Sequence, residues 1–274
     1  MTKIYKKSIS YRTFNILGIK VDFINLPQAL SQVEAWIDNN KQYQITTPNP
    51  EHIVMSLDDY RFKEILNKSA LRICDGVGLS WAAKFLSRKI SRISNKADKD
   101  SCYIKTEFDN CLSGVDLMQA LCAKAAKKKW RVFLLGGKND VVQKAAFQLK
   151  KNSKDLKVEY DSGSLNIENE SPKELRKTIE KINKFKPQLL FVAFGAPIQE
   201  KWIYNNLKKL KVKVAMGVGG SFDYLAGKVK RAPKVIRNHS LEWLWRLIIE
   251  PWRFKRQLRL LKFVYLVIKE GKHS

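Results

Sequence analysis

The feature that most restricts the fold of this sequence is its alternation between short apolar runs and longer amphipathic segments. The apolar runs are rich in β-branched and aromatic residues and end in Gly, Pro, Asn or Asp, as buried strands do. One such run is PQLLFVAFG at 187–195, which is followed by a segment with helical spacing at 197–210 and by a second run at 212–220. This alternation predicts βαβ units and therefore an α/β fold with a doubly wound, mostly parallel, Rossmann-like sheet.

The rest of the chain continues the pattern, with one interruption. Residues 87–110 are polar and lysine-rich and have no clear period, which predicts an inserted loop. The predicted strands lie at 14–25 (one or two short strands), 42–47, 70–76, 130–137, 156–163, 187–195 and 212–220. The predicted helices lie at 26–40, 48–57, 77–86, 115–129, 139–151, 171–185 and 197–210.

Ligands of such sheets bind beyond the carboxyl ends of the strands, so the residues that follow each predicted strand are the site candidates. Gly-rich turns and helix N-termini at these positions favour a nucleotide or a sugar phosphate. A local role also fits several of these residues: a carboxylate before Gly can form a turn, and Thr or Asn can cap a helix. The candidates are Thr47, Asn49, Asp75, Gly136, Gly137, Gln199 and Asp223.

Several classes of enzyme lack support in the sequence. It contains no GxxxxGK[ST] and no GxSxG, and its GVGGSF differs from the dinucleotide-binding GxGxxG. With three histidines and no CxxC pair, a zinc site is not expected. The Asp-Lys-Asp at 98–100 is interpreted as part of a solvated loop rather than as a metal site. The cysteines are Cys74, Cys102, Cys111 and Cys122, and we expect free thiols in a reducing cytoplasm.

The charge of the chain favours a polyanionic partner. The 52 Lys and Arg residues outnumber the 26 Asp and Glu residues, which gives a formal net charge of +26. An anionic membrane, a phosphorylated substrate and nucleic acid all fit, although no nucleic-acid recognition motif is present. Lysine codons of an AT-rich genome explain scattered Lys but not clustered Arg.

The C-terminal stretch 241–269 mixes Trp, Arg and Leu and is too polar to span a membrane. It predicts an amphipathic appendage, residues 231–274, on a core of residues 1–230. Packing of terminal helices on the core, or burial in a homo-oligomer interface, is the alternative.

A set of motifs in a fixed order gives a closer indication of function. They are TTPNPEHIV, CDGVGLSWAAKFL, GVDLMQALC, VFLLGG, VAFGAPIQEKWI, GVGGSFDYLAGKVKRAP and LEWLWRLIIEPWRFKRQ. Together, over about residues 14 to 260, they resemble the WecG/TagA/CpsF glycosyltransferases of bacterial cell-surface polymer synthesis.

The resemblance implies transfer of an N-acetylmannosamine-type sugar from a UDP-sugar to a polyprenyl-diphosphate-linked sugar. It implies inversion at the anomeric carbon, no cofactor or metal, and a cytoplasmic enzyme held peripherally on the inner face of the bacterial plasma membrane. With a lipid-linked acceptor, the aromatic residues expected at the lipid headgroup region are Trp243, Trp245, Trp252, Phe254, Phe263 and Tyr265. Matched motif by motif, the catalytic base is Asp75, assisted by Thr47, Asn49 and Gln199, and Asp223 contacts the uridine. The diphosphate is expected near Arg246, Arg253 and Arg256, with the amides of Gly136 and Gly137 as further candidates.

One position departs from the family pattern. In DNCLSGVD, Cys111 stands where relatives are expected to carry an active-site Arg. Either a cation of the insertion (Arg88, Arg92 or Lys105) replaces it, or the donor specificity has changed, or the activity is weak. A nucleotide-dependent oxidoreductase and a catalytically lapsed lipid-binding relative are the alternative functions.

Overall fold

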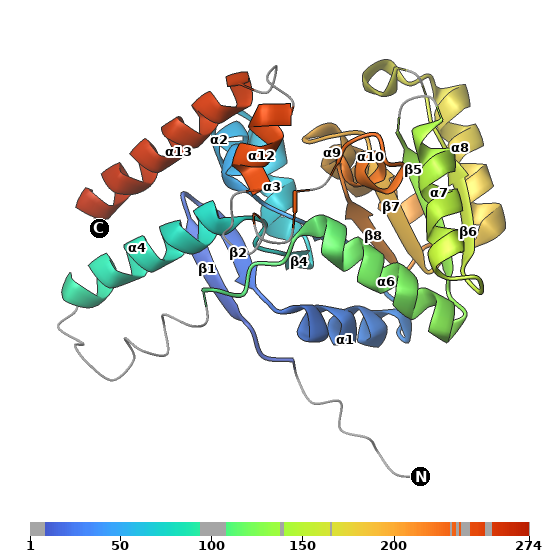
Figure 1. The fold of residues 1–274 in the computed structure, drawn as a ribbon, viewed down its shortest axis with the longest axis horizontal. Coiled ribbons are helices and arrows are strands. Elements are labelled where there is room, and N and C mark those ends of the chain that lie inside the picture. Colours follow the sequence, from blue (N-terminus) through green and yellow to red (C-terminus); the bar gives the residue numbers. More distant parts are fainter. Residues whose placement is uncertain are drawn as a thin grey trace, which may run out of the picture.

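The structure is a computed structural model that describes residues 9–93, 108–137, 140–164, 166–230, 232–233, 236, 242–249 and 254–273. Its centre is a six-stranded sheet in the order β4-β3-β8-β7-β5-β6, in which every strand pair is parallel (Figure 1). The strands are β3 (Tyr43–Thr46), β4 (Leu71–Arg72), β5 (Arg131–Gly136), β6 (Lys157–Asp161), β7 (Leu189–Ala193) and β8 (Val214–Gly217). The predicted doubly wound α/β fold is thereby confirmed.

Helices cover both faces of the sheet because its strands are apolar on both faces. Successive residues of a strand point to opposite sides, so Phe191 and Met216 belong to one core cluster while Leu190 and Ala215 belong to another. The first cluster lies under α1 (Leu26–Ile37), α6 (Gly114–Lys128) and α7 (Val141–Asn152). The second lies under α8 (Pro172–Phe185) and α9 (Ile198–Asn206).

The segment predicted as one or two strands at 14–25 forms an antiparallel hairpin of β1 (Arg12–Ile16) and β2 (Ile19–Phe23). A buried ion pair attaches this hairpin to the edge of the main sheet. The Asp22 carboxylate is fully buried, lies 2.9 Å from Arg72 Nη2, and accepts hydrogen bonds from Arg72 N and Thr13 Oγ1. The hairpin packs against α2 (Pro50–Asp58), α3 (Tyr60–Lys68) and α4 (Val77–Ile93).

The C-terminal helices are α12 (Glu242–Ile249) and α13 (Phe254–His273), and α13 lies across α2 and α4 (Figure 1). The side chains of Phe263 and Val267 are fully buried in the cluster beneath α13. The prediction that Phe263 faces lipid headgroups is therefore wrong, because the same helix uses this face to cover the core. The domain boundary near residue 230 stays a prediction.

The predicted loop at 87–110 is partly helical. Helix α4 continues to Ile93, since residues 87–93 contain neither Gly nor Pro, and polar residues alone do not end a helix. Residues 108 and 109 form a turn, and residues 94–107, with the Asp-Lys-Asp at 98–100, lie outside the described residues. Helix α3, the short helix α10 (Ser221–Leu225) and the 3-10 turns at Ile167–Asn169 and Leu207–Lys209 are additional to the predicted elements.

The expectation of free thiols is wrong for Cys74 and Cys111, which form a disulfide with their Cα atoms 4.9 Å apart. The two cysteines are 37 positions apart in sequence, so no local spacing indicated that they would meet. Cys122 is free and buried, and this burial raises the pKa of its thiol to about 12. Cys102 lies outside the described residues.

We expect reduction of the Cys74–Cys111 disulfide to lower the free energy of unfolding by about 4 kcal/mol, the loop-closure value for a loop of 37 residues. Urea denaturation with and without dithiothreitol measures this difference. The Cys111→Ser variant should lose the dependence on dithiothreitol, whereas Cys122→Ser should keep it. Equal unfolding curves for the oxidised and reduced wild type would contradict the expectation.

Candidate active site

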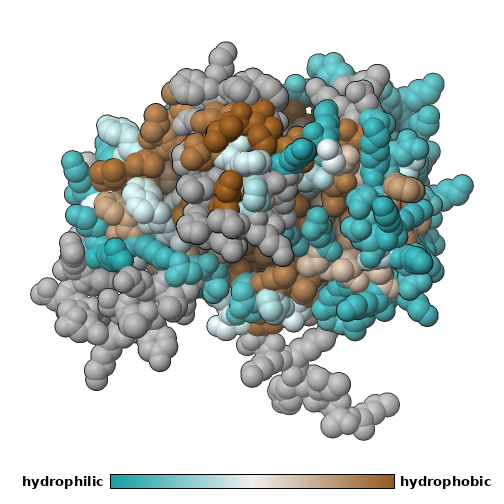
Figure 2. Space-filling view, in the orientation of Figure 1, coloured by the Kyte–Doolittle hydropathy of each residue, from teal (hydrophilic) through white to brown (hydrophobic). Residues whose placement is uncertain are grey.

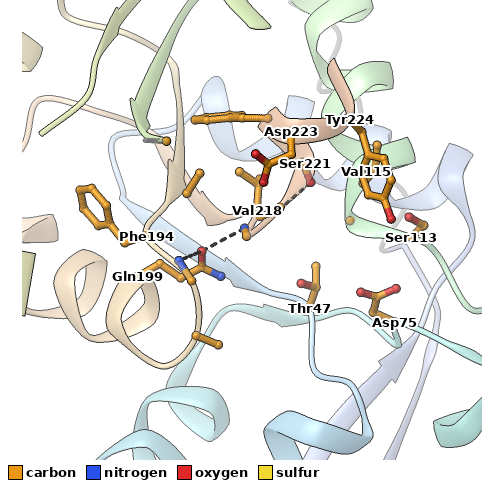
Figure 3. Close-up of a pocket in the computed structure, with 18 of the residues that line it drawn as sticks. Thr47, Asp75, Ser113, Val115, Phe194, Gln199, Val218, Ser221, Asp223 and Tyr224 are labelled. Carbon is orange, nitrogen blue, oxygen red and sulfur yellow. Dashed lines mark hydrogen bonds between the residues drawn. The ribbon is translucent and has the colours of Figure 1, made fainter. Parts of the chain in front are cut away.

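A pocket of about 470 Å³ opens at the carboxyl edge of the main sheet (Figure 3). Its walls come from the residues that follow β3, β4, β5, β7 and β8, together with the start of α6. Strand-end residues that the sequence indicated separately meet there: Thr47, Asn49, Asp75, Gly137, Gln199 and Asp223 all line the pocket. This convergence follows from the parallel sheet, in which all strands point to the same edge.

The carboxylate of Asp75 enters the pocket between the sheet and α6. Asp75 follows β4, and its backbone N–H donates to Pro48 O at 2.9 Å, which joins the ends of two neighbouring strands. Figure 3 shows Asp75 between Thr47 and Ser113, with Asp223 farther away across the pocket. The preceding residue, Cys74, is held by the disulfide, so the backbone that carries this carboxylate is anchored on its N-terminal side.

Asn49 has the local role that the sequence left open as an alternative. Its side-chain oxygen accepts a hydrogen bond from His52 N at 2.9 Å and thereby caps α2. The Nδ2 group is the part of this side chain that remains for a ligand. Thr47 is only 7% exposed and lies against Gly114, the first residue of α6. Asn49 and Thr47 thus shape the pocket as well as line it.

Gln199 joins two turns at the base of the pocket. Its Oε1 accepts hydrogen bonds from Gly195 N at 3.2 Å and from Gly219 N at 2.9 Å (Figure 3). Gly195 follows β7 and Gly219 follows β8, so one buried amide sets the distance between neighbouring strand ends. Its Nε2 donates to Glu200 Oε1 at 2.7 Å.

The starts of three helices lie at the pocket, where Gly114, Val141 and Gln199 line it. The residues before α6, α7 and α9 (Ser113, Asp140 and Pro197) make no side-chain capping hydrogen bond. The caps of α1, α2, α3 and α8, by contrast, accept hydrogen bonds from their first turns. Uncapped first turns present N–H groups and the positive end of the helix dipole, which suits a phosphate.

The two glycines that were predicted to bind phosphate differ in their position relative to the pocket. Gly137 lines the pocket, whereas Gly136 does not and instead determines how closely β5 and β7 approach. Gly136 has a φ of +98°, and a Cβ atom added there would lie 2.8 Å from Ala193 O. We therefore expect Gly136 to support the shape of the site rather than to contact a ligand.

Sequence reasoning missed Ser113, Tyr224 and Lys228, which also line the pocket. Lys228 belongs to GKVKRAP, one of the motifs of the family resemblance, and that was the signal that could have identified it. Arg246 and Arg256 lie on helices whose backbone is described, but their side chains are not described, and Arg253 lies outside the described residues. Among the cations suggested as replacements for Arg at position 111, Arg88 is exposed on α4. The side chain of Arg92 is not described, and Lys105 lies outside the described residues.

Glu200, the neighbour of Gln199, is not among the candidate site residues that the sequence indicated. Its side chain is almost fully buried, and this burial raises the pKa of its carboxyl to about 7. Oε1 accepts the hydrogen bond from Gln199, while Oε2 has no hydrogen-bond partner among the described residues.

Among the described residues, no group of three or more His, Cys, Asp and Glu side chains is arranged to hold a metal ion. No described helix combines the length and the apolar character needed to cross a membrane.

Comparison with known proteins gives a consistent family. The profile of the glycosyl transferase WecG/TagA/CpsF family matches residues 14–98 and 101–274. A Bacillus subtilis (strain 168) protein named N-acetylglucosaminyldiphosphoundecaprenol N-acetyl-beta-D-mannosaminyltransferase is 30% identical over 259 residues, which cover 91% of each chain. A protein of the same name from Bacillus spizizenii is 30% identical over 93% of this chain and 91% of its own length. Another from Staphylococcus aureus (strain NCTC 8325) is 27% identical over 93% of this chain and 92% of its own length.

The buried carboxyl of Glu200 predicts a pH-dependent cost in stability. In the unfolded chain this group ionises near its ordinary pKa of 4.5, whereas in the folded protein it holds its proton to about 7. The unfolded state therefore binds fewer protons between these values, so stability falls as pH rises through this window. The difference between the two pKa values corresponds to about 3 kcal/mol of stability. This stability is present below pH 4.5 and is fully lost above pH 7.

We expect Glu200→Gln to unfold at higher urea than the wild type at pH 8, and this advantage to shrink by about 2 to 3 kcal/mol at pH 5. Glu180→Gln, at an exposed position on α8, is the matched control and should show no such change. An advantage for Glu200→Gln that is the same at both pH values would contradict the expectation.

Proposed function

The chain belongs to the WecG/TagA/CpsF family of glycosyl transferases, and we propose that it transfers N-acetylmannosamine or a related hexosamine from a UDP-sugar to a polyprenyl-diphosphate-linked sugar. The names of its relatives describe such a transfer to N-acetylglucosaminyldiphosphoundecaprenol. The observation that carries the proposal is the pocket itself. One cavity holds a carboxylate suited to be a base, Asp75, together with uncapped helix starts suited to a diphosphate.

The proposed reaction is a single displacement. A hydroxyl oxygen of the acceptor sugar attacks C1 of the donor sugar and gives its proton to the Asp75 carboxylate. The bond between C1 and the diphosphate oxygen breaks, UDP leaves with the bonding electrons, and the configuration at C1 is inverted. A positioned general base of this kind contributes about a hundredfold to ten-thousandfold in rate.

The negative charge that develops on UDP requires positive groups placed in advance. We assign this role to the first-turn N–H groups of α6, α7 and α9 and to Lys228, which lies beyond α10 on the pocket wall. Asp223 remains the proposed contact of the uridine, and Arg246, Arg253 and Arg256 remain proposed cations for the diphosphate. We expect no metal ion or cofactor to take part.

The C-terminal helices supply a surface for the lipid-linked acceptor. Apolar residues are exposed on one side of α13 and on α12, where Figure 2 shows hydrophobic colours over both helices. They are Leu244, Ile248, Ile249, Leu258, Leu261, Tyr265 and Ile268. We propose that this surface rests on the cytoplasmic face of the bacterial plasma membrane without spanning it.

An ion pair connects this surface with the pocket. Arg259 on α13 lies 2.6 Å from Glu51 on α2, and Glu51 also lines the pocket. Helix α13 thus packs directly on an element that forms the site, so an acceptor held at the surface would lie near the donor.

The first test is UDP release from UDP-N-acetylmannosamine with and without a polyprenyl-diphosphate-N-acetylglucosamine acceptor. We expect acceptor-dependent release, and we expect Asp75→Asn to reduce it at least a hundredfold while UDP binding stays within about twofold. Asp155→Asn, an exposed carboxylate between α7 and β6, is the matched control and should retain wild-type turnover.

Turnover of Asp75→Asn at the wild-type rate would overturn the assignment of the base. Release from another UDP-hexosamine would keep the mechanism and change the donor. Binding of UDP without release from any donor would favour a catalytically lapsed relative.

The second test concerns Lys228. We expect Lys228→Gln to weaken UDP binding by about tenfold at low salt, and less at high salt because ions screen an exposed charge. Calorimetric titration at two salt concentrations measures both effects. Lys230→Gln removes the same charge two positions away, outside the pocket lining, and should change the affinity by less than about twofold. Equal effects of the two variants would show that general charge, and not a contact at Lys228, attracts UDP.

A further inference from the structure

The amide of Gln199 has nearly all of its hydrogen-bonding groups assigned by the protein. Its oxygen accepts from two backbone N–H groups, Gly195 N and Gly219 N, and its nitrogen donates one hydrogen to Glu200 Oε1. A side-chain amide has two N–H donors and one carbonyl oxygen. One N–H therefore remains, on a residue that lines the pocket.

We infer that Glu200 is a positioning residue that fixes the orientation of the Gln199 amide, so that the pocket presents an N–H donor to the substrate. The group that Gln199 meets is then a hydrogen-bond acceptor, such as an oxygen of the donor sugar. The identity of that sugar rests on the proposed function, whereas the orientation of the amide does not.

The opposite orientation of this amide is excluded by its surroundings. A flipped Gln199 would place its NH2 group against the N–H groups of Gly195 and Gly219. Two donor–donor contacts would then replace two hydrogen bonds in a buried position, where unmade hydrogen bonds cost most. The flipped oxygen would face Glu200 Oε1, which can donate to it only when that atom carries the proton.

Glu200 is itself held in place from two sides. Its backbone oxygen accepts a hydrogen bond from Gln44 Nε2 on β3 at 3.1 Å. Strand β8 lies so close to the two side chains that a Cβ atom added at Gly217 would be 2.8 Å from Gln199 Nε2 and 2.9 Å from Glu200 Oε1. The two side chains are thus packed against a strand backbone, with little space to reorient.

The positioning role does not require Glu200 to be ionised. A protonated carboxyl still offers Oε1 as an acceptor when the proton is on Oε2, and burial of the side chain favours this neutral form. A glutamine at position 200 also offers an oxygen at the same place. The conservative substitution therefore separates the role of the acceptor from the role of the charge.

The direction of the remaining N–H agrees with this role. Figure 3 shows the nitrogen of the Gln199 amide on the side of Thr47 and Asp75, while its oxygen points to the turn after Val218. A sugar that occupied the space above Asp75 would thus meet a donor from Gln199.

The test compares Glu200→Gln with Glu200→Met, a variant of similar length that has no acceptor oxygen. We expect Glu200→Met to reduce kcat/KM for the UDP-sugar by about tenfold or more and to lower the affinity for UDP-sugar while leaving that for UDP unchanged. Glu200→Gln should stay within about twofold on both measures. Thermal unfolding of both variants shows whether they fold.

A double-mutant cycle identifies the route of the effect. If Glu200 acts through Gln199, Glu200→Met should cause no further loss in a Gln199→Met background. Fully additive losses, or a Glu200→Gln variant as impaired as Glu200→Met, would overturn the inference.

A measurement without substrate tests the inference independently of the proposed function. NMR of the ligand-free protein should show slow hydrogen exchange at the Gln199 side-chain amide, assigned by its loss in Gln199→Met. Glu200→Met should accelerate this exchange, and Glu200→Gln should not. Unchanged exchange in Glu200→Met would overturn the inference. If the wild type and both variants show the expected exchange but the protein turns over no UDP-sugar, only the proposed function is overturned.

Discussion

A parallel sheet places all of its strand-to-helix turns at one edge, and this constraint determines where the chemistry of the protein can occur. The turns after β3, β4, β5, β7 and β8 form the walls of a single pocket. The same geometry directs the N-terminal ends of α6, α7 and α9 toward it. The carboxylate of Asp75 and the uncapped starts of three helices therefore come together although they are far apart in sequence.

The arrangement of these turns depends on contacts beneath the pocket. Gln199 joins the turns after β7 and β8, and the backbone of Asp75 is joined to that of Pro48. The Cys74–Cys111 disulfide connects the end of β4 to the segment before α6. At the outer side, α13 covers α2 and exposes an apolar face, so one helix belongs both to the core and to the proposed membrane surface.

The sequence predicted the parts of the fold and of the site that depend on local pattern. Strand and helix periods gave the α/β class, and the strand-end rule selected Thr47, Asp75 and Gln199, which the structure brings into one pocket. Pattern reasoning failed at two segments. Residues 87–93 were predicted as a loop, but they contain neither Gly nor Pro and extend α4. Phe263 was predicted as a lipid contact, but its packing against residues distant in sequence buries it in the core. The roles of the pocket residues stay proposals.

What the sequence determined by itself was the alternation of strands and helices, the family and the residues at the strand ends, because these depend on spacing and composition along the chain. Tertiary structure alone decided which atoms meet: Cys74 with Cys111 across 37 positions, Arg259 with Glu51, and Gln199 with the turns on either side. The raised pKa of the Glu200 carboxyl has the same origin, since burial is a property of the packed molecule. Such contacts depend on which residues the order of strands brings close together in space. The spacing of residues along the sequence does not specify these distances.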